Sequence, residues 1–532
     1  MTADGRLDSK ARPARVARDG AIIRAMVAGL ALTILPAFAA PNTTLGYDDA
    51  RHLLARTGFG PTDAEVLAFA PLTRGEAVAK LLRETRTTAV TPPPASAIDT
   101  SPLRPPRGEN VPEAERKAFV QQQIREGLAL RGWWIQEMLA TPSPLTERMT
   151  LFWHNHFVSA QPKVRITRLM YRQNVTLREY ALGSFGAFLH AIAKDPAMVL
   201  YLDSVQNRKG APNENFAREV MELFTLGEGR YTEQDVKEAA RAFTGWSLER
   251  ETGTFVFRAR LHDDGTKTVL GRTGRLDGDA VLDILLARPE TAEFVTTKLW
   301  REFVSPDPDP ALVAVIARRF RESSYDIKVA LRELLASDAF YAPENRGVLV
   351  KSPVELVVGT LRQLDLAPDN ALPFAVAAAG MGQNLMSPPN VKGWPGGETW
   401  INTTTLLARK QYLDRVTRAG DADPTMTIAA SGRESMDMER NAPKRALTPQ
   451  GVPDAEKARQ QRFQRQMERG LASLDFDSAR WMAKFPGPAP AERARAAQQL
   501  LLATAPQQRP DYDADSRTLV HAIVLDAAYQ LK

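Results

Sequence analysis

The sequence predicts a mainly α-helical protein, with one multi-helical globular domain and a small β-hairpin inserted in it. Helix-start signals recur along the chain, such as the capping box of Thr62 and Glu65 and the Asp195-Pro196 pair. Strand character is confined to residues 254–270, around a type I′ turn signal at Asp264-Gly265. With 44% apolar and 25% charged residues, the 532-residue chain has the composition of a globular protein.

Start and stop signals divide most of the chain into short helices. The first begins near Asp48 and ends at Gly58, which we expect to be its C′ glycine. A second capping box, Thr176 with Glu179, predicts a helix that runs to Ala193. Further helices are predicted at residues 113–140, 146–158, 214–226, 232–243, 278–287, 290–304, 310–321, 325–337, 351–365, 490–503 and 515–530.

Shifts in composition indicate how the chain is organised. The core domain spans residues 113–419 and carries the hairpin near 254–271. Residues 420–460 are polar and poor in large apolar side chains, which predicts a flexible insertion. The remaining predicted parts are a targeting segment (1–39), an N-terminal helical segment (40–83), a Pro-rich surface linker (84–112) and C-terminal helices that pack on the core (461–532).

The first 39 residues have the three parts of a Sec-type signal peptide. The first 24 residues contain six Arg or Lys and three Asp, an apolar stretch runs from Ala25 to Leu35, and an A-x-A pattern ends at Ala39. We therefore expect cleavage after Ala39 and a periplasmic or secreted protein that is not attached to a membrane. The alternatives are an uncleaved anchor or a disordered leader.

The composition also excludes several classes of protein. There is no cysteine, which rules out disulfides, thiolate metal sites and cysteine nucleophiles. The net charge of +6 is partly due to the first 24 residues, and the rest is too mildly basic to indicate a nucleic-acid partner. The absence of GxxxxGK[ST], GxSxG and HExxH motifs disfavours nucleotide hydrolysis, α/β-hydrolase chemistry and ordinary zinc proteases.

The first candidate for chemistry is the pair His154 and His156, which lies in the apolar segment 152–157. A helix that is apolar on all sides is buried, and a buried imidazole without a hydrogen-bond partner costs on the order of 1–3 kcal/mol. On a regular helix the two rings point to nearly opposite sides. Both therefore reach one metal ion only if the helix ends or distorts there; otherwise one faces a site and the other is structural.

The second candidate is the predicted helix 214–226, where Glu219 and Glu222 share a stripe beside the apolar face. Carboxylates next to imidazoles suit a divalent metal ion with nitrogen and oxygen ligands. They also suit general acid–base work without a metal. The alternative is that both are solvated carboxylates paired with Arg218 or with lysines, and that the histidines are core residues bonded to backbone carbonyls.

Two further segments could contribute to a site. His262 is placed at the rim of the hairpin, where a loop residue can be aimed at a pocket. The Pro- and Gly-rich loop 386–402 contains Lys392, Trp394 and Trp400 among polar side chains. Aromatic faces beside amides can hold a sugar ring, but a packed loop whose tryptophans fill the core is an interpretation of equal standing.

Several long blocks resemble, in order, the bacterial domain-of-unknown-function 1800 family. They are ARHLLARTGFGPT (50–62), RMTLFWHNHFVSA (148–160), residues 194–246, HDDGTKTVLG (262–271) and PPNVKGWPGGETWIN (388–402). The resemblance implies a mostly helical and mostly exported protein without an established activity. Its recurring blocks fall on His154, Asn155, His156, Asn213, Glu214, Asn215, Arg218, Glu219, Glu222, His262, Asp263, Asn390, Lys392, Gly393 and Trp394, and leave out His190 and His521.

These features lead to two functional hypotheses. The first is a hydrolytic or oxidative enzyme in which a divalent metal ion activates water and a spare carboxylate such as Glu222 acts as base. Arg218 or Lys392 would orient an anionic group of an unidentified small molecule or glycan. The second is a non-catalytic envelope protein that binds a glycan or a protein partner, with the His/Glu set as a hydrogen-bond network. The predicted metal ligands are His154, His156, Glu219, Glu222 and His262.

Overall fold

The computed structural model describes residues 43–103, 111–418 and 474–532, together with residues 465, 467 and 470. The predicted signal peptide and the polar insertion at 420–460 lie outside the described residues. The described chain is mainly helical and has only two small two-stranded sheets, which confirms the predicted fold class. None of its helices combines the length and the apolar character that a bilayer crossing needs.

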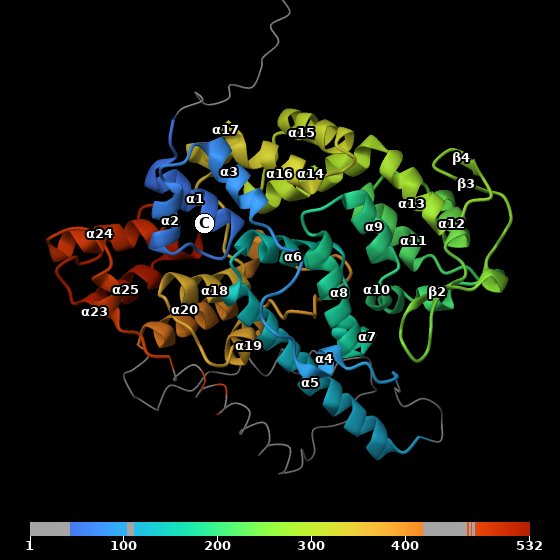
Figure 1. Ribbon diagram of the computed structural model, residues 1–532, viewed down its shortest axis with the longest axis horizontal. Helices are drawn as coiled ribbons and strands as arrows, with labels where there is room; N and C mark the ends of the chain where they lie inside the picture. Colours follow the sequence, from blue (N-terminus) through green and yellow to red (C-terminus); the bar gives the residue numbers. More distant parts are fainter. Residues whose placement is uncertain (1–42, 104–110, 419–464, 466, 468–469, 471–473) are drawn as a thin grey trace, which may run out of the picture. The chain divides into compact units, whose positions relative to one another are not determined.

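The helices follow one another along the described chain, and a long loop separates α19 from η5 (Figure 1). Up to residue 242 they are α1 (Gly46–Thr57), α2 (Asp63–Phe69), α3 (Arg74–Arg83), α4 (Ala95–Ile98), α5 (Glu113–Ala140), α6 (Pro144–His156), α7 (Gln161–Val164), α8 (Thr167–Tyr180), α9 (Phe185–Ala193), α10 (Pro196–Tyr201), η1 (Ser204–Gln206), α11 (Asn215–Glu219), the π-helix η2 (Val220–Thr225) and α12 (Glu233–Ala242).

After residue 242 the described elements include two pairs of short strands and then helices again. The helices are η3 (Ala259–Leu261), α13 (Gly278–Ala287), α14 (Pro289–Phe303), α15 (Pro310–Glu322), α16 (Ile327–Ala336), α17 (Asp338–Tyr341), η4 (Pro343–Asn345), α18 (Pro353–Gln363), α19 (Leu372–Gly380), η5 (Gly397–Trp400), α20 (Thr403–Thr417), α23 (Ser478–Met482), α24 (Pro490–Leu501), α25 (Ser516–Leu525) and η6 (Ala527–Gln530).

The strands pair differently from the prediction. β1 (Trp246–Leu248) pairs antiparallel with β2 (Phe255–Phe257), and β3 (Lys267–Val269) pairs with β4 (Arg272–Gly274). The tight turn of the second hairpin is Leu270-Gly271, where both residues have positive φ as a type I′ turn requires. The predicted turn at Asp264-Gly265 is therefore wrong, because Asp263 accepts a hydrogen bond from the Gly265 amide and closes a local loop there instead.

The structure confirms some of the predicted helix boundaries and shows that others are wrong. Thr62 and Asp195 are N-caps as predicted. Thr176 is not a cap: it lies within α8 and its hydroxyl donates to the Arg172 carbonyl, while Ser184 caps α9. Gly58 does end α1, but at a φ of −139° rather than in the left-handed conformation of a C′ glycine.

The predicted surface linker at 84–112 is more ordered than expected in its described part. It contains α4, and the backbone amides of Val90 and Thr91 donate to the buried carboxylate of Glu137 on α5. The indole of Trp133 donates to the Thr91 carbonyl in return. This segment is therefore attached to α5 by hydrogen bonds, because Glu137 would otherwise be a buried charge without partners.

A buried ion pair joins α6 to α8, which lie side by side near the centre of Figure 1. Glu147 accepts from Arg178 through both carboxylate oxygens, at 2.5 and 2.9 Å, and both side chains are at most 2% exposed. The Trp134 indole of α5 donates to the same carboxylate at 2.8 Å, and Arg178 also donates to Asn174. The pair fixes α6, the helix that carries His154 and His156, relative to its neighbours.

Candidate functional site

The segment with the two glutamates is a helix that changes its geometry in the middle. α11 is a regular α-helix up to Glu219 and continues without interruption as the π-helix η2. The wider turn is visible in the bonding, because the amide of Leu226 donates to the Met221 carbonyl five residues back, and the Thr225 hydroxyl donates to the Val220 carbonyl. π-Helical turns are rare in proteins, and those that occur are often found at functional sites.

The end of this π-helix is closed by side chains from two other helices. His156 of α6 donates from Nε2 to the Phe224 carbonyl at 3.1 Å, and Lys298 of α14 donates to the Leu223 carbonyl at 3.2 Å. Lys298 Nζ also lies 3.1 Å from Nδ1 of His156, so both ring nitrogens of His156 bond to protein groups. The last carbonyls of a helix lack internal partners and attract cations. His156 and Lys298 therefore act as a cap for η2.

His154 lies in an aromatic environment beside this cap. Its ring is 1% exposed, with centroid distances of 5.4 Å to Trp134 and 5.6 Å to Trp394. Burial lowers the pKa of His154 to about 3, so the ring is neutral at ordinary pH. Its Nε2 atom has no hydrogen-bond partner within the described residues. His154 and His156 thus have different environments, as the helical spacing predicted.

The Pro- and Gly-rich loop is attached to α6 through Asn155. The Asn155 side chain accepts from the Trp394 amide at 2.7 Å and donates to the Trp394 carbonyl at 3.2 Å. Gly393 has a φ of +80°, and a Cβ atom there would lie only 2.2 Å from Asn155 Oδ1. Trp394 and Trp400 are both buried, so the interpretation of a packed loop holds for the tryptophans.

Glu219 and Glu222 lie three residues apart on this segment and have different surroundings. Glu222 accepts from the Tyr231 hydroxyl at 2.7 Å, and its other oxygen lies 3.8 Å from Lys392 Nζ. Glu219 is half-buried, and within the described residues it has no hydrogen bond or ion pair. Partial burial, and then the charge of Glu222, raise the pKa of Glu219 above its ordinary value.

The two predicted cations beside the glutamates have different roles. Lys392 is exposed and bridges Glu222 and Glu228, with its Nζ 3.1 Å from the latter. Arg218 instead pairs with Glu214 and Glu233 and donates to Glu233 through both of its terminal nitrogens. Lys392 is thus positioned beside the carboxylates, whereas the guanidinium of Arg218 is used to join α11 to the start of α12.

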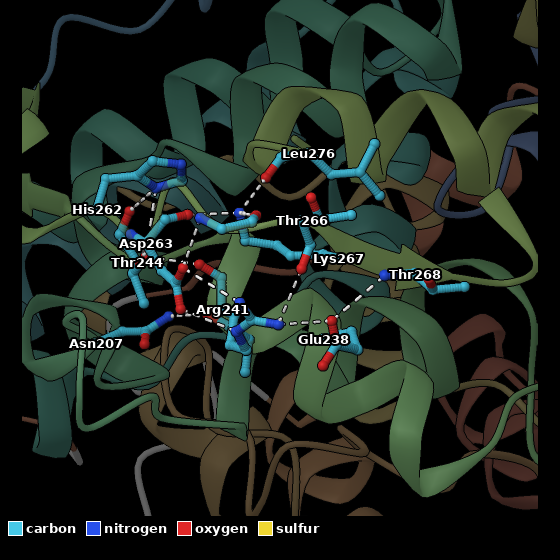
Figure 2. Close-up of polar contacts among 12 residues, drawn as sticks. Asn207, Glu238, Arg241, Thr244, His262, Asp263, Thr266, Lys267, Thr268 and Leu276 are labelled. Atoms are coloured by element: carbon cyan, nitrogen blue, oxygen red, sulfur yellow. Dashed lines mark hydrogen bonds and ion pairs between the residues drawn. The ribbon is translucent and has the colours of Figure 1, made fainter. Parts of the chain in front are cut away.

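His262 lies in a network of its own near β3 (Figure 2). Its Nδ1 lies 2.9 Å from the Thr244 carbonyl, and its ring packs on Phe257. The neighbouring Asp263 pairs with Arg241, which lowers the pKa of that carboxyl to about 2. Lys267, which is 1% exposed, donates to the carbonyls of residues 263, 265 and 276. The HDDGTK segment therefore serves to hold this loop together.

The five predicted metal ligands do not fit one shared metal ion in this arrangement. Throughout the described ranges, no three His, Cys, Asp or Glu side chains come together where they could hold a metal ion. His156 bonds through both ring nitrogens, and His262 bonds to Thr244 rather than to a glutamate. What the structure does bring together is α6, the segment α11–η2, and the loop that carries Lys392 and Trp394.

Tyr231, Lys298 and the π-turn are parts of the site that were not predicted from the sequence. Lys298 carried a usable signal, because it falls four residues after Phe294 and three after Val295, on the apolar face of α14. A lysine on the apolar face of a helix either extends its ammonium group to the solvent or forms hydrogen bonds in the protein interior. Burial lowers its pKa to about 8. Tyr231 had no pattern that pointed to Glu222.

A wider groove lies elsewhere, beside β1 and η3. Its volume is about 590 Å³, within the range of small-molecule sites. Apolar side chains such as Leu169 and Leu200 line it together with Arg250, Arg258 and Arg260. No predicted site residue lines this groove.

The fold and the site define a mainly helical protein in which a partly π-helical segment presents two glutamates beside a loop rich in Pro and Gly. Comparison with known families gives the same answer as the sequence blocks. A family model described as "Protein of unknown function (DUF1800)" matches residues 52–531, nearly the whole chain. The chain therefore belongs to this family. No curated protein and no solved structure matches it.

Proposed function

We propose that this protein is a hydrolytic enzyme whose acid–base pair is Glu219 and Glu222. The observation that supports the proposal is the contrast between the two carboxylates on one segment. Glu219 is half-buried and has no hydrogen bond or ion pair among the described residues. Glu222 accepts a hydrogen bond from the Tyr231 hydroxyl and lies near the Lys392 ammonium. Neighbouring titratable groups in unlike environments are the arrangement that acid–base enzymes use.

The environments assign the roles. Glu219, with its raised pKa, is the group that holds a proton and gives it to a leaving oxygen. Glu222, which accepts from the Tyr231 hydroxyl and lies near the Lys392 ammonium, is the group that we assign to take a proton from the attacking water. Cleavage of a glycosidic bond needs only such a pair of carboxylates, so a glycan is the substrate class that we propose. The bond to the leaving oxygen breaks, and each product gains a hydroxyl group.

The test is reducing-sugar release from soluble polysaccharides and aryl glycosides by the full chain and its variants. Glu219→Gln and Glu222→Gln are each expected to lower kcat at least about 100-fold, since acid–base groups contribute 10² to 10⁴ in rate. Glu293→Gln on α14, an exposed glutamate, is the matched control and is expected to retain full activity. Activity of the parent enzyme should fall as the pH rises above the pKa of Glu219.

Three results would contradict the proposal. One is activity that survives in both Gln variants. Another is activity that chelation by EDTA abolishes and a divalent cation restores, which would favour the metal-dependent enzyme predicted from the sequence. The third is binding of a glycan or a protein without turnover, which would favour a non-catalytic binding protein.

The non-catalytic alternative has its own supporting observation. His156 closes η2 and His262 bonds to a backbone carbonyl, which are the roles expected of histidines in a structural network. Either function fits an exported protein, and export itself is part of the proposal. N-terminal sequencing of the protein recovered from the periplasm or medium would show Ala40 as the first residue if cleavage follows Ala39.

A further inference from the structure

A small cavity that neither Glu219 nor Glu222 lines has more cationic than acidic side chains in its wall. It lies where α1 and α18 meet the residues that follow η6, and its volume is about 20 Å³. That is room for about one water-sized particle. Its charged lining consists of Arg51 from α1, Lys351, Lys532 and Glu355 from α18. Among the lining side chains there are thus three cations and one carboxylate.

The one carboxylate of the lining already has partners. Glu355 is 5% exposed and accepts from Lys532, and also from Arg148 of α6 at 2.7 Å. Arg148 is bonded in turn to Glu302. Glu355 therefore pairs directly with Lys532 and Arg148, and its carboxylate acts on Lys351 only from beyond ion-pair distance.

Arg51 and Lys351 have no direct ion pair of this kind among the described residues. Arg51 is 6% exposed, and within the described part of the chain its Nε has no hydrogen-bond partner and no carboxylate lies within ion-pair distance of it. The charge of Asp48, on the same helix, offsets only part of its own. Lys351 Nζ lies 3.8 Å from the centroid of the Tyr529 ring and has no acidic partner among the described residues. Arg409, which donates to the Lys351 carbonyl, adds a further positive charge.

Uncompensated buried charges are costly. Burial, and then the charge of Arg51, lower the pKa of Lys351 to about 7, although the carboxylate of Glu355 acts in the opposite direction. Burial, and then the charge of Arg148, lower the pKa of Lys532 to about 8. A negative charge in the cavity would offset both the desolvation and the repulsion, and an arginine–lysine pair supplies the donors that an anion needs.

We propose that this cavity binds a small monovalent anion of about the size of chloride, held between Arg51 and Lys351. The site does not involve Glu219 or Glu222, so it is independent of the proposed acid–base function. Its role is to stabilise the contact between α1, α18 and the residues after η6.

The experiment compares thermal midpoints of the full chain in sodium gluconate and in sodium chloride at constant ionic strength. Chloride should raise the midpoint in a saturable manner, because a ligand that binds only the folded state stabilises it. Lys351→Met removes a cation that has no acidic partner, so it should fold, and its apparent chloride affinity should fall at least tenfold. Lys237→Met, which removes an exposed lysine on α12, should leave the chloride effect unchanged.

Two outcomes would overturn the proposal. The first is equal midpoints in chloride and gluconate. The second is a chloride effect of the same size in Lys351→Met as in the parent protein, which would place the anion elsewhere. Arg51→Lys keeps the charge and should retain part of the effect, whereas Arg51→Met should lose it. ³⁵Cl line broadening that is lost in Lys351→Met would support direct binding without reference to stability.

Discussion

The buried pair Glu147–Arg178 offers a sharp test of how the helices around the candidate site are held. Glu147→Gln keeps the shape of the side chain but removes its charge. Arg178, which is 2% exposed, would then keep its positive charge without a counter-charge, and one of its two bonds to residue 147 would face an amide nitrogen.

The magnitude follows from that geometry. Removing one partner of a buried ion pair costs about 3–5 kcal/mol, because the other charge stays buried and uncompensated. Removing both charges costs less, since no charge is left without a partner. We therefore expect the double variant Glu147→Gln with Arg178→Met to be more stable than Glu147→Gln alone. The favourable coupling should be about 2 kcal/mol or more, within the range for residues of one network.

The assay is urea unfolding followed by tryptophan fluorescence and far-UV circular dichroism, with coincident transitions as the check that a single step is measured. Glu293→Gln serves as the exposed control and should change stability by less than about 0.5 kcal/mol. A loss below 1 kcal/mol in Glu147→Gln, or a double variant less stable than the single one, would refute the reasoning.

Two further predictions concern histidine burial and the loop. Burial lowers the pKa of His154 to about 3 from an ordinary value of 6.5. Between those two pH values the unfolded chain binds a proton at His154 that the folded chain does not bind. The free energy of unfolding therefore decreases as the pH is lowered. His154→Phe should flatten this fall by up to about 1.4 kcal/mol per pH unit in urea titrations from pH 7 to 4, and an unchanged slope would contradict the assignment. Gly393→Ala should cost at least about 1–2 kcal/mol, because φ is +80° there and the new Cβ meets Asn155. We expect trypsin to cleave after Lys392 faster in Gly393→Ala than in the parent protein, because the loop is held less firmly. An unchanged cleavage rate would contradict the conclusion that Asn155 holds this loop.

Most of the fold could be predicted because its signals are local. The capping box at Thr62 and the Asp195-Pro196 pair place helix starts through contacts within four residues, and both are found. The failures occur where a local signal competes with tertiary bonds. Thr176 looked like a cap but bonds back to Arg172 inside α8, and the Asp264-Gly265 turn signal lies in a loop held by Lys267.

The site could be predicted only as a set of segments. Sequence patterns indicate α6, the glutamate segment and the Trp394 loop as candidate parts of a site, and the structure brings these segments together. The roles within them could not be predicted, since they depend on partners far away in sequence. The part that His156 plays in capping η2 depends on Lys298 of α14, which lies 142 residues further along the chain.

The π-turn of this chain leads to an expectation about its relatives. A π-turn holds one residue more than an α-turn, so a relative that is one residue shorter between positions 220 and 225 would close this stretch into an ordinary helix. In such a relative the side chains after the missing position would be rotated by about 100° around the axis, which is the step per residue of a 3.6-residue helix. If such shorter relatives also lack the counterparts of Tyr231 and Lys392, the two residues that contact Glu222, then the π-turn and these contacts arose together.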